Sequence, residues 1–170
     1  MTAGREAEVA QQIENVEDDA VTRRRLAASL RQQMYRVSEA ADAVAMEETL
    51  ARDPADVLLV DINLGGKDGL TITREQRAVS KVGIILLTSR TDQIDRIVGL
   101  ELGADDYVTK PFDKRELFAR IKNLAARVAE CRAARAEARA PSADPVIGGW
   151  RLDRARRRLV GEDDTVEALT

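Results

Sequence analysis

The sequence predicts an α/β fold: a doubly wound, five-stranded parallel sheet with helices on both faces, followed by a C-terminal antiparallel β fragment. Short apolar runs alternate along the chain with longer amphipathic stretches, which is typical of parallel βαβ units. Four of these runs are followed by polar groups that a parallel sheet would bring to one edge. The 170 residues suffice for one such domain plus an extension.

The spacing of apolar residues predicts five strands and five helices in alternation. The strands are 13–16, 35–37, 55–60, 82–87 and 107–108, and the helices are 20–33, 41–51, 70–79, 92–102 and 114–132. Residues 1–12 are polar and are expected to be disordered. The first strand is unusual because it contains Glu14 and Asn15, whereas a strand buried on both faces normally reads as a continuous apolar run. We expect this strand to be short, to begin late, or to weaken the domain.

The composition changes after Cys131. Residues 132–146 are mostly Ala, Arg, Pro and Ser, which is typical of a linker. Residues 147–170 contain two or three short strand patterns, too few to bury a core without a partner. We interpret the arginines between Arg151 and Arg158 as the solvated face of a hairpin rather than as a nucleic-acid contact.

The composition also excludes several classes of protein. The net charge of −3 is not that of a dedicated nucleic-acid binder. The absence of His excludes His-based acid–base catalysis, and the single Cys131 cannot form an internal disulfide. The N-terminus lacks the features of a signal peptide, and no apolar run approaches the ~20 residues needed to span a bilayer. We therefore expect a cytoplasmic protein with no membrane segment.

The polar groups at the ends of the runs point to phosphoryl chemistry. Glu17 and Asp18 follow the first run, Asp61 the third, Thr88 the fourth and Lys110 the fifth. Carboxylates, a hydroxyl and an ammonium at one edge suit a divalent metal and a phosphoryl group. Asp61 is the candidate nucleophile, and Mg²⁺ is the natural counter-ion because it takes one or two carboxylates and a phosphate oxygen.

Each of these residues has a simpler explanation when taken alone. The acidic run from Glu17 to Asp19 is more often the start of a helix than a metal site, Asp61 could be a solvated carboxylate, and Lys110 could be a surface lysine. Thr88 could be a helix cap, and Tyr107 a core aromatic. Only their joint placement at the ends of the expected strands predicts a site.

Residues 13–131 resemble a response-regulator receiver domain (CheY-like), the phosphoacceptor module of two-component signalling. Glu17, Asp18, Asp61, Thr88 and Lys110 match the five site positions of that family, and Tyr107 matches its aromatic switch position. The stretch 103–112 is similar to the OmpR/PhoB subfamily of transcription factors. Residues 149–153 resemble the first strands of the subfamily's winged-helix DNA-binding domain, which is incomplete in this chain.

This resemblance implies specific roles. Asp61 would accept a phosphoryl group from a partner histidine kinase, with Asp18, Asp61 and the backbone carbonyl of Asn63 binding Mg²⁺ and Glu17 acting through water. Lys110 and Thr88 would contact phosphoryl oxygens, and Thr88 and Tyr107 would form the switch. The chain would be a regulator rather than an enzyme, and only a full-length form would bind promoter DNA.

The resemblance also implies a homodimer through the fourth helix, fifth strand and fifth helix. The residues expected on that face are Arg96, Ile97, Leu100, Asp105, Asp106, Glu116, Ala119, Arg120 and Lys122. Ion pairs would fix the register of the dimer, and the apolar centre would supply affinity.

Two residues depart from the family pattern, and two other functions remain open. Gly65 replaces the Pro usual after Leu64, and Met34 replaces a usual Gly, so we expect a looser loop and a less stable domain. A phosphatase of the haloacid-dehalogenase type is a poor alternative, because Asn63 stands where the required second acid would be. A degenerate receiver acting as a constitutive protein-interaction module is favoured only by the polar first strand.

Overall fold

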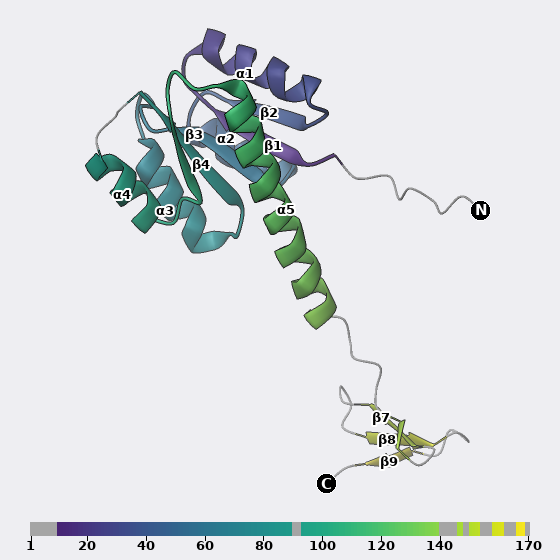
Figure 1. Ribbon diagram of the computed structural model, residues 1–170. Coiled ribbons are helices and arrows are strands. Elements are labelled where there is room, and N and C mark those ends of the chain that lie inside the picture. The colour runs from purple at the N-terminus through teal and green to yellow at the C-terminus, as the bar shows by residue number, and fades with distance from the viewer. Residues whose placement is uncertain are drawn as a thin grey trace, which may run out of the picture. The chain divides into compact units, whose positions relative to one another are not determined.

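The computed structural model describes residues 10–89 and 93–139, together with the strands at 146–147, 150–153, 158–161 and 166–168. The first part contains a five-stranded parallel sheet of order β2-β1-β3-β4-β5 (Figure 1). The strands are β1 (Gln12–Val16), β2 (Arg36–Ala40), β3 (Val57–Asp61), β4 (Gly83–Thr88) and β5 (Asp106–Thr109). The helices are α1 (Ala20–Gln32), α2 (Ala43–Arg52), α3 (Gly69–Val79), α4 (Gln93–Glu101) and α5 (Lys114–Arg139). The predicted doubly wound α/β fold is confirmed.

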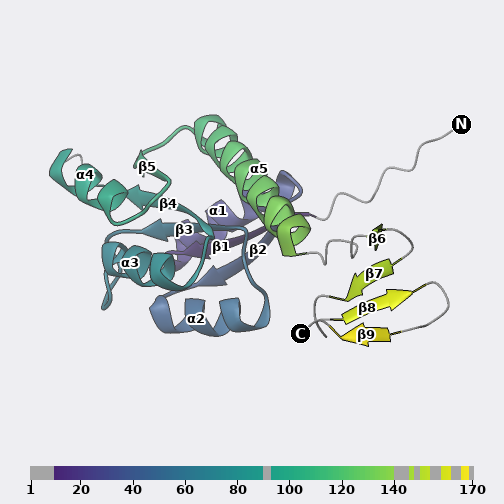
Figure 2. The same cartoon turned by 90° about the horizontal axis from the view of Figure 1, so that it is seen from below.

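The helices lie on both sides of the sheet (Figure 2), and the sheet separates two hydrophobic cores. Leu58 and Val60 of β3 pack on the side covered by α2 and α3, whereas Val57 and Leu59 pack on the side covered by α1 and α5. This alternation follows from the pleat of a strand, in which successive side chains point to opposite faces. Asp61 continues the series of Val57 and Leu59 and therefore belongs to the α1/α5 side.

Three of the helices begin at an aspartate. The side chains of Asp19, Asp42 and Asp68 accept hydrogen bonds from backbone N–H groups three residues later, at 2.7, 2.8 and 2.8 Å. Each satisfies a donor that the helix itself leaves unpaired. Because Asp19 caps α1, the acidic run after β1 has both proposed roles: its last residue starts the helix, while Glu17 and Asp18 remain for the site.

The polar first strand is neither short nor late, so those two expectations were wrong. All five residues of β1 are buried, and β1 pairs with both β2 and β3. The strand begins at Gln12, so the expected disorder does not extend to that residue; residues 1–9 lie outside the described part. The backbone N–H of Gln12 donates to Asp56 at 2.8 Å, and its side-chain amide donates to Ser38. Through these bonds, the backbone N–H and the side-chain NH₂ group of Gln12 at the start of β1 have hydrogen-bond partners within the domain.

Glu14 is fully buried on the α2 side of the sheet, opposite Ser38 of β2. Neither carboxylate oxygen has a hydrogen-bond partner within the described residues. Burial raises the pKa of Glu14 to about 7, partly offset by the Ser38 hydroxyl and reinforced by the nearby charges of Asp53 and Glu39. The third expectation for the first strand, that it weakens the domain, therefore depends on the charge of Glu14.

Met34 has a left-handed backbone conformation, with φ of 68°. This explains why the family usually has Gly here, since a side chain in that conformation costs roughly 1–2 kcal/mol. The side chain is 82% exposed and gains little from packing. The expected loss of stability at Met34 is explained by this left-handed backbone conformation, whose cost the exposed side chain does not offset.

The fifth helix does not end at Arg132 as predicted but continues through Arg139. The Ala- and Arg-rich composition of residues 132–139 predicts a linker. Both residues favour helix, and no Gly or Pro interrupts the segment. The first part of the expected linker is therefore helical.

The chain divides into two compact units, Met1–Glu130 and Cys131–Thr170. The second unit contains an antiparallel sheet of order β6-β7-β8-β9, formed by β6 (Val146–Ile147), β7 (Trp150–Asp153), β8 (Arg158–Gly161) and β9 (Val166–Ala168). Among the residues with a described structure, no helix is both long and apolar enough to cross a membrane.

We predict that the charge of Glu14 destabilises the folded domain at neutral pH. The folded state holds a proton that the unfolded chain releases near pH 4.5, so the free energy of unfolding should fall as the pH rises from 4.5 through about 7. The shift corresponds to about 3 kcal/mol. Urea unfolding should show Glu14→Gln to be more stable than the wild type at pH 8 and similar to it near pH 4.5. Parallel pH profiles of the two proteins would contradict this.

Candidate functional site

The strand register brings the predicted site residues to one edge of the sheet. Val16 lies opposite Val60, so Glu17 and Asp61 follow at the same level on neighbouring strands. On the other side of β3, Asp61 lies opposite Leu87, and Thr88 is the next residue of β4. The backbone N–H of Lys110, just after β5, donates to the carbonyl of Thr88 at 2.6 Å. Four strand ends thus contribute to a single site.

Lys110 lies between two of the carboxylates. Its Nζ donates to Asp61 Oδ2 and to Glu17 Oε2, both at 2.6 Å. The lysine side chain is 22% exposed, and both carboxylates are buried. Burial alone would lower the pKa of Lys110, but the bonds to Asp61 and Glu17 outweigh it and raise the pKa above its usual value. Burial raises the pKa of Glu17, against the opposing effect of Lys110. The ammonium therefore holds two carboxylates together at the strand ends.

The other acceptors of the site are bound by loop backbone. Asn63 N–H donates to Asp61 Oδ1 at 2.8 Å, and Gly65 N–H donates to Asp18 Oδ2 at 3.2 Å. A proline at 65 would have no N–H to donate. The departure from the family pattern thus supplies the loop after β3 with a donor for Asp18.

The residue types fit a magnesium site, although the described residues contain no group of three acidic side chains already arranged as metal ligands. Asp18, Asp61 and the Asn63 carbonyl offer only oxygen atoms, which Mg²⁺ prefers. Glu17 and Asp61 have the Lys110 ammonium as their cation. A bound ion would therefore compete with Lys110 for these two carboxylates.

Thr88 and Tyr107 lie on the other side of the sheet from Asp61. Tyr107 lies opposite Leu86, and both belong to the core that α2 and α3 cover. Thr88 is two residues after Leu86 and therefore faces the same side; it is fully buried. The Tyr107 ring is only 8% exposed and lies near Gly99 of α4. The predicted switch residues thus share one face, with the tyrosine ring packed inside.

Two residues that support the site are not predicted by the sequence pattern. A Cβ on Gly69 would lie 2.4 Å from the carbonyl oxygen of Asp61 and 2.8 Å from Cα of Ile62, so only glycine allows α3 to start against the end of β3. Asp68-Gly69 had the signal of a turn but not of this close approach. Arg23 donates to the carbonyl of Glu17 at 2.7 Å, and nothing in the run of three arginines singles it out.

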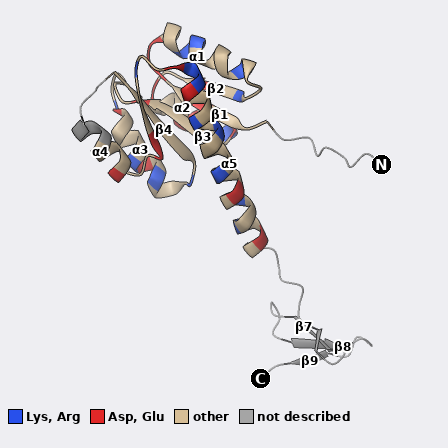
Figure 3. Ribbon diagram, in the orientation of Figure 1, with Lys and Arg blue, Asp and Glu red and all other residues tan. Residues whose placement is uncertain are grey.

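The residues of the expected dimer face are in several different environments. Ile97 and Leu100 of α4 are 55% and 43% exposed, whereas the side chain of Arg96 lies outside the described part. Arg120 of α5 forms ion pairs within its own chain, to Asp106 at 2.7 Å and to Glu116 at 2.6 Å. Figure 3 shows acidic and basic residues along α5. The apolar pair on α4 is thus available for contact, while the Arg120 charge is already partnered.

Asp105, also expected on that face, is engaged on the α3 side. Its carboxylate accepts from Arg77 Nη2 at 2.8 Å and from Ile84 N–H at 2.9 Å. Arg77 also donates to the carbonyl of Gly103 at 2.8 Å. Asp105 therefore ties the start of β5 to α3 and β4.

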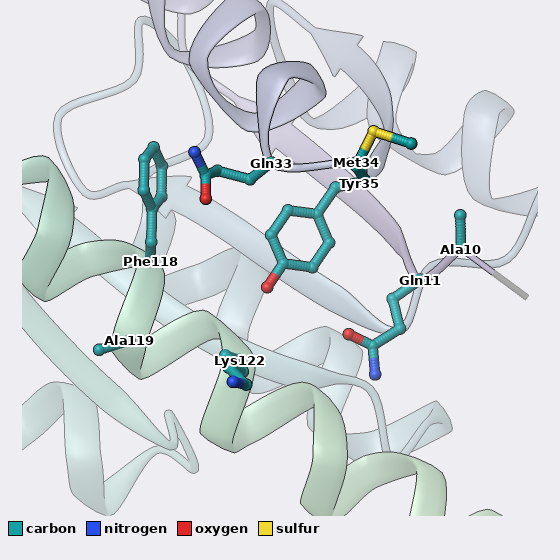
Figure 4. A pocket seen from close by; sticks show the side chains of 8 residues that line it. All are labelled: Ala10, Gln11, Gln33, Met34, Tyr35, Phe118, Ala119 and Lys122. Carbon is teal, nitrogen blue, oxygen red and sulfur yellow. The ribbon is translucent and has the colours of Figure 1, made fainter. Parts of the chain in front are cut away.

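A pocket of about 530 Å³ lies apart from the carboxylates (Figure 4). Its lining residues are Ala10, Gln11, Gln33, Met34, Tyr35, Phe118, Ala119 and Lys122. None of the five predicted site residues (Glu17, Asp18, Asp61, Thr88 and Lys110) lines this pocket. Two residues of the expected dimer face, Ala119 and Lys122, border this pocket beside Tyr35.

Comparisons with known proteins agree with the geometry. The family model for the response regulator receiver domain matches residues 13–122. The transcriptional regulatory protein AruR of Pseudomonas aeruginosa is 49% identical over 160 residues, covering 91% of this chain and 65% of AruR. The TorCAD operon transcriptional regulatory protein TorR of Escherichia coli (strain K12) is 51% identical over 113 residues, covering 66% of this chain and 49% of TorR. The chain thus spans between about half and two thirds of the length of these curated relatives.

Solved structures give the same result. The receiver domain of TorR superposes with a TM-score of 0.66 at 50% identity, covering 69% of this chain and 98% of that one. The beryllofluoride-activated receiver domain of Klebsiella pneumoniae RstA superposes with a TM-score of 0.65 at 36% identity, covering 67% and 97%. The resemblance inferred from the strand-end residues is confirmed.

We predict that Gly69→Ala destabilises the domain, because the added methyl would meet backbone atoms at the end of β3 that cannot move without displacing Asp61. The cost should be about 1–3 kcal/mol. Gly65→Ala is the matched control, since a Cβ there would make only an ordinary contact with Asp18 at 3.6 Å. Urea unfolding should separate the two variants. Equal stability of both would show that the approach of α3 to β3 is not as close as described.

Proposed function

Because the chain belongs to the response regulator receiver domain family, we propose that Asp61 accepts a phosphoryl group from a partner histidine kinase. The reaction depends on Mg²⁺, and it switches the dimerisation of a longer transcription regulator located in the cytoplasm. The observation that carries this proposal is the Lys110 ammonium, which contacts both Asp61 and Glu17 at 2.6 Å at the carboxyl edge of the sheet.

The chemistry is a transfer between two nucleophiles. A carboxylate oxygen of Asp61 forms a bond to phosphorus while the phosphorus–nitrogen bond of the donor histidine breaks. Lys110 is already beside Asp61 and offsets negative charge on the transferred group, and the Asn63 N–H orients the other carboxylate oxygen. When bound, Mg²⁺ supplies further positive charge at the phosphoryl oxygens, held by Asp18, Asp61 and the Asn63 carbonyl, with Glu17 acting through water. In this proposal the domain accelerates the transfer mainly by positioning Asp61 and by placing positive charge beside the phosphoryl group.

The switch couples the two sides of the sheet. A phosphoryl group on Asp61 accepts a hydrogen bond from Thr88, which draws the hydroxyl toward the site. Tyr107 lies on the same face as Thr88, two residues away across the β4–β5 pair. The Tyr107 ring is packed inside the core. Phosphorylation favours this inward ring position over other ring positions that the domain already samples. The ring position in turn shapes the neighbouring surface of α4.

That surface is the proposed homodimer face, made by α4, β5 and α5. Ile97 and Leu100 supply its exposed apolar centre. Arg120, Asp106 and Glu116 form an intrachain charge cluster beside it, whose pairs can be exchanged with those of a second copy. Promoter DNA is bound only by a full-length form, since AruR and TorR are transcriptional regulators longer than this chain.

A constitutive protein-interaction module is the second candidate. The specific observation in its favour is the buried, unpartnered Glu14 in the central part of the sheet, because a receiver weakened there has less energy to drive a switch. The intact contacts of Lys110 with Asp61 and Glu17 favour the phosphoacceptor. Labelling with a phosphodonor separates the two.

We predict that Asp61 is the sole phosphorylation site. Acetyl phosphate or phosphoramidate with Mg²⁺ should add one phosphate to the wild type, measured by intact-protein mass spectrometry, and none to Asp61→Asn. Asp18→Ala or EDTA should abolish labelling, because Asp61 alone holds a strongly hydrated cation poorly. Labelling of Asp61→Asn at equal yield would refute the assignment, and equal labelling in EDTA would refute the metal dependence.

We predict that beryllofluoride with Mg²⁺ increases dimerisation of the wild type, measured by sedimentation velocity. Ile97→Asp should weaken the dimer about tenfold or more, since it places a charge in the apolar centre and costs at least ~1.4 kcal/mol. Val44→Asp is the matched control, because Val44 is equally apolar, is 66% exposed and lies on α2, away from the proposed face. An unchanged monomer fraction in protein shown to bind beryllofluoride would argue against the switch. Equal weakening by both variants would place the interface elsewhere.

A further inference from the structure

Arg23 is the first of three successive arginines in α1, and its side chain turns back to the loop that precedes the helix. Its Nη1 donates to the backbone carbonyl of Glu17 at 2.7 Å and to that of Asp18 at 3.2 Å. Its backbone N–H donates to the carbonyl of Asp19 at 2.9 Å. A single residue thus binds three successive carbonyls of the acidic loop.

Arg23 is itself held by two strands. Its carbonyl accepts a hydrogen bond from the side-chain amide of buried Asn15 in β1 at 3.0 Å. Its Nε lies 3.9 Å from a carboxylate oxygen of Glu39 in β2, and Arg31 contacts the other oxygen at 3.0 Å. The side chain of Arg23 is only 15% exposed. Its guanidinium therefore has a fixed position relative to the sheet.

The two arginines that follow do not share this environment. Arg24 and Arg25 are exposed, and within the described residues neither side chain contacts the loop. The direction of a helical side chain explains the difference, since only one of three successive residues can point toward the strand end. The contact is specific to Arg23 rather than a general effect of basic residues in α1.

We propose that Arg23 is a positioning residue for the metal-binding carboxylates, a role that rests on the proposed phosphoacceptor function. It touches neither carboxylate in the described contacts but fixes the peptide groups from which Glu17 and Asp18 extend. A loop whose carbonyls are pinned presents its carboxylates in one arrangement, so Mg²⁺ binding does not have to order them. Groups that orient metal ligands in this way typically change metal affinity 10–100-fold. The polar Asn15 has a function in this arrangement, because its side-chain amide donates to the carbonyl of Arg23, and Arg23 in turn binds the loop carbonyls.

The test is Mg²⁺ titration calorimetry of the full chain without phosphodonor. Arg23→Met keeps the apolar stem and removes all donors, and it should raise the Mg²⁺ dissociation constant 10–100-fold. Arg23→Lys should recover most of the affinity, because an ammonium can donate to the same two carbonyls. Arg24→Met is the matched control and should bind Mg²⁺ like the wild type.

Two outcomes would overturn the proposal. One is equal Mg²⁺ affinity of Arg23→Met and the wild type. The other is a Lys variant as weak as the Met variant at equal thermal stability, which would mean that donation to the loop is not what matters. If Arg23→Met does not fold, Glu39→Leu replaces it. This variant removes the acceptor beside Arg23 Nε without touching the loop and should weaken Mg²⁺ binding several-fold, and unchanged binding would overturn the proposal equally. Failure of the proposed function appears separately, as a wild type that binds Mg²⁺ but is not labelled at Asp61.

Discussion

The contact between Lys110 and two carboxylates is the interaction on which the rest of the site depends. Three acidic side chains at neighbouring strand ends repel one another, and a sheet that brings them together needs a compensating charge. Lys110 provides this charge from the end of β5, which lies on the other side of β4 from β3 within the sheet. Its ammonium is 2.6 Å from both Asp61 and Glu17. The acidic edge is therefore assembled in the folded domain with Lys110 as its cation, and the proposed chemistry would exchange partners around that ammonium.

Apart from the Lys110 ion pairs, the supports of this edge each involve a backbone group. Asp61 and Asp18 accept from loop N–H groups, Arg23 binds loop carbonyls, and Gly69 lets a helix start directly against the strand. Backbone groups keep their direction when neighbouring side chains change rotamer. A site built this way tolerates substitution on the surface around it and is sensitive to changes in the path of the chain.

The sequence was sufficient for the parts of the structure that follow from local periodicity and from strand order. Apolar runs located the strands, and a parallel sheet brings strand ends together, so Asp61, Thr88 and Lys110 could be predicted as neighbours. The tertiary partners of polar residues could not be predicted. Asn15 looked like a defect in β1 because its partner, the Arg23 carbonyl, is defined only by the packing of α1. The helical continuation of α5 was missed for a different reason: the composition of residues 132–139 was compared with that of a linker, although Ala and Arg both favour helix.

The pleat of β4 has a consequence for how the domain can vary. Asp61 and Lys110, where we propose that the phosphoryl chemistry occurs, lie on one side of the sheet, whereas Thr88 and Tyr107 lie on the other. Thr88 faces the same side as Tyr107 because it lies two positions after Leu86 and four after Ile84, both of which face that side. Gain or loss of one residue within β4 would turn every later side chain of the strand to the opposite face. The loops at the ends of the sheet can change in length, but the number of residues along this strand cannot, because the proposed coupling between Asp61 and Tyr107 depends on whether that number is odd or even.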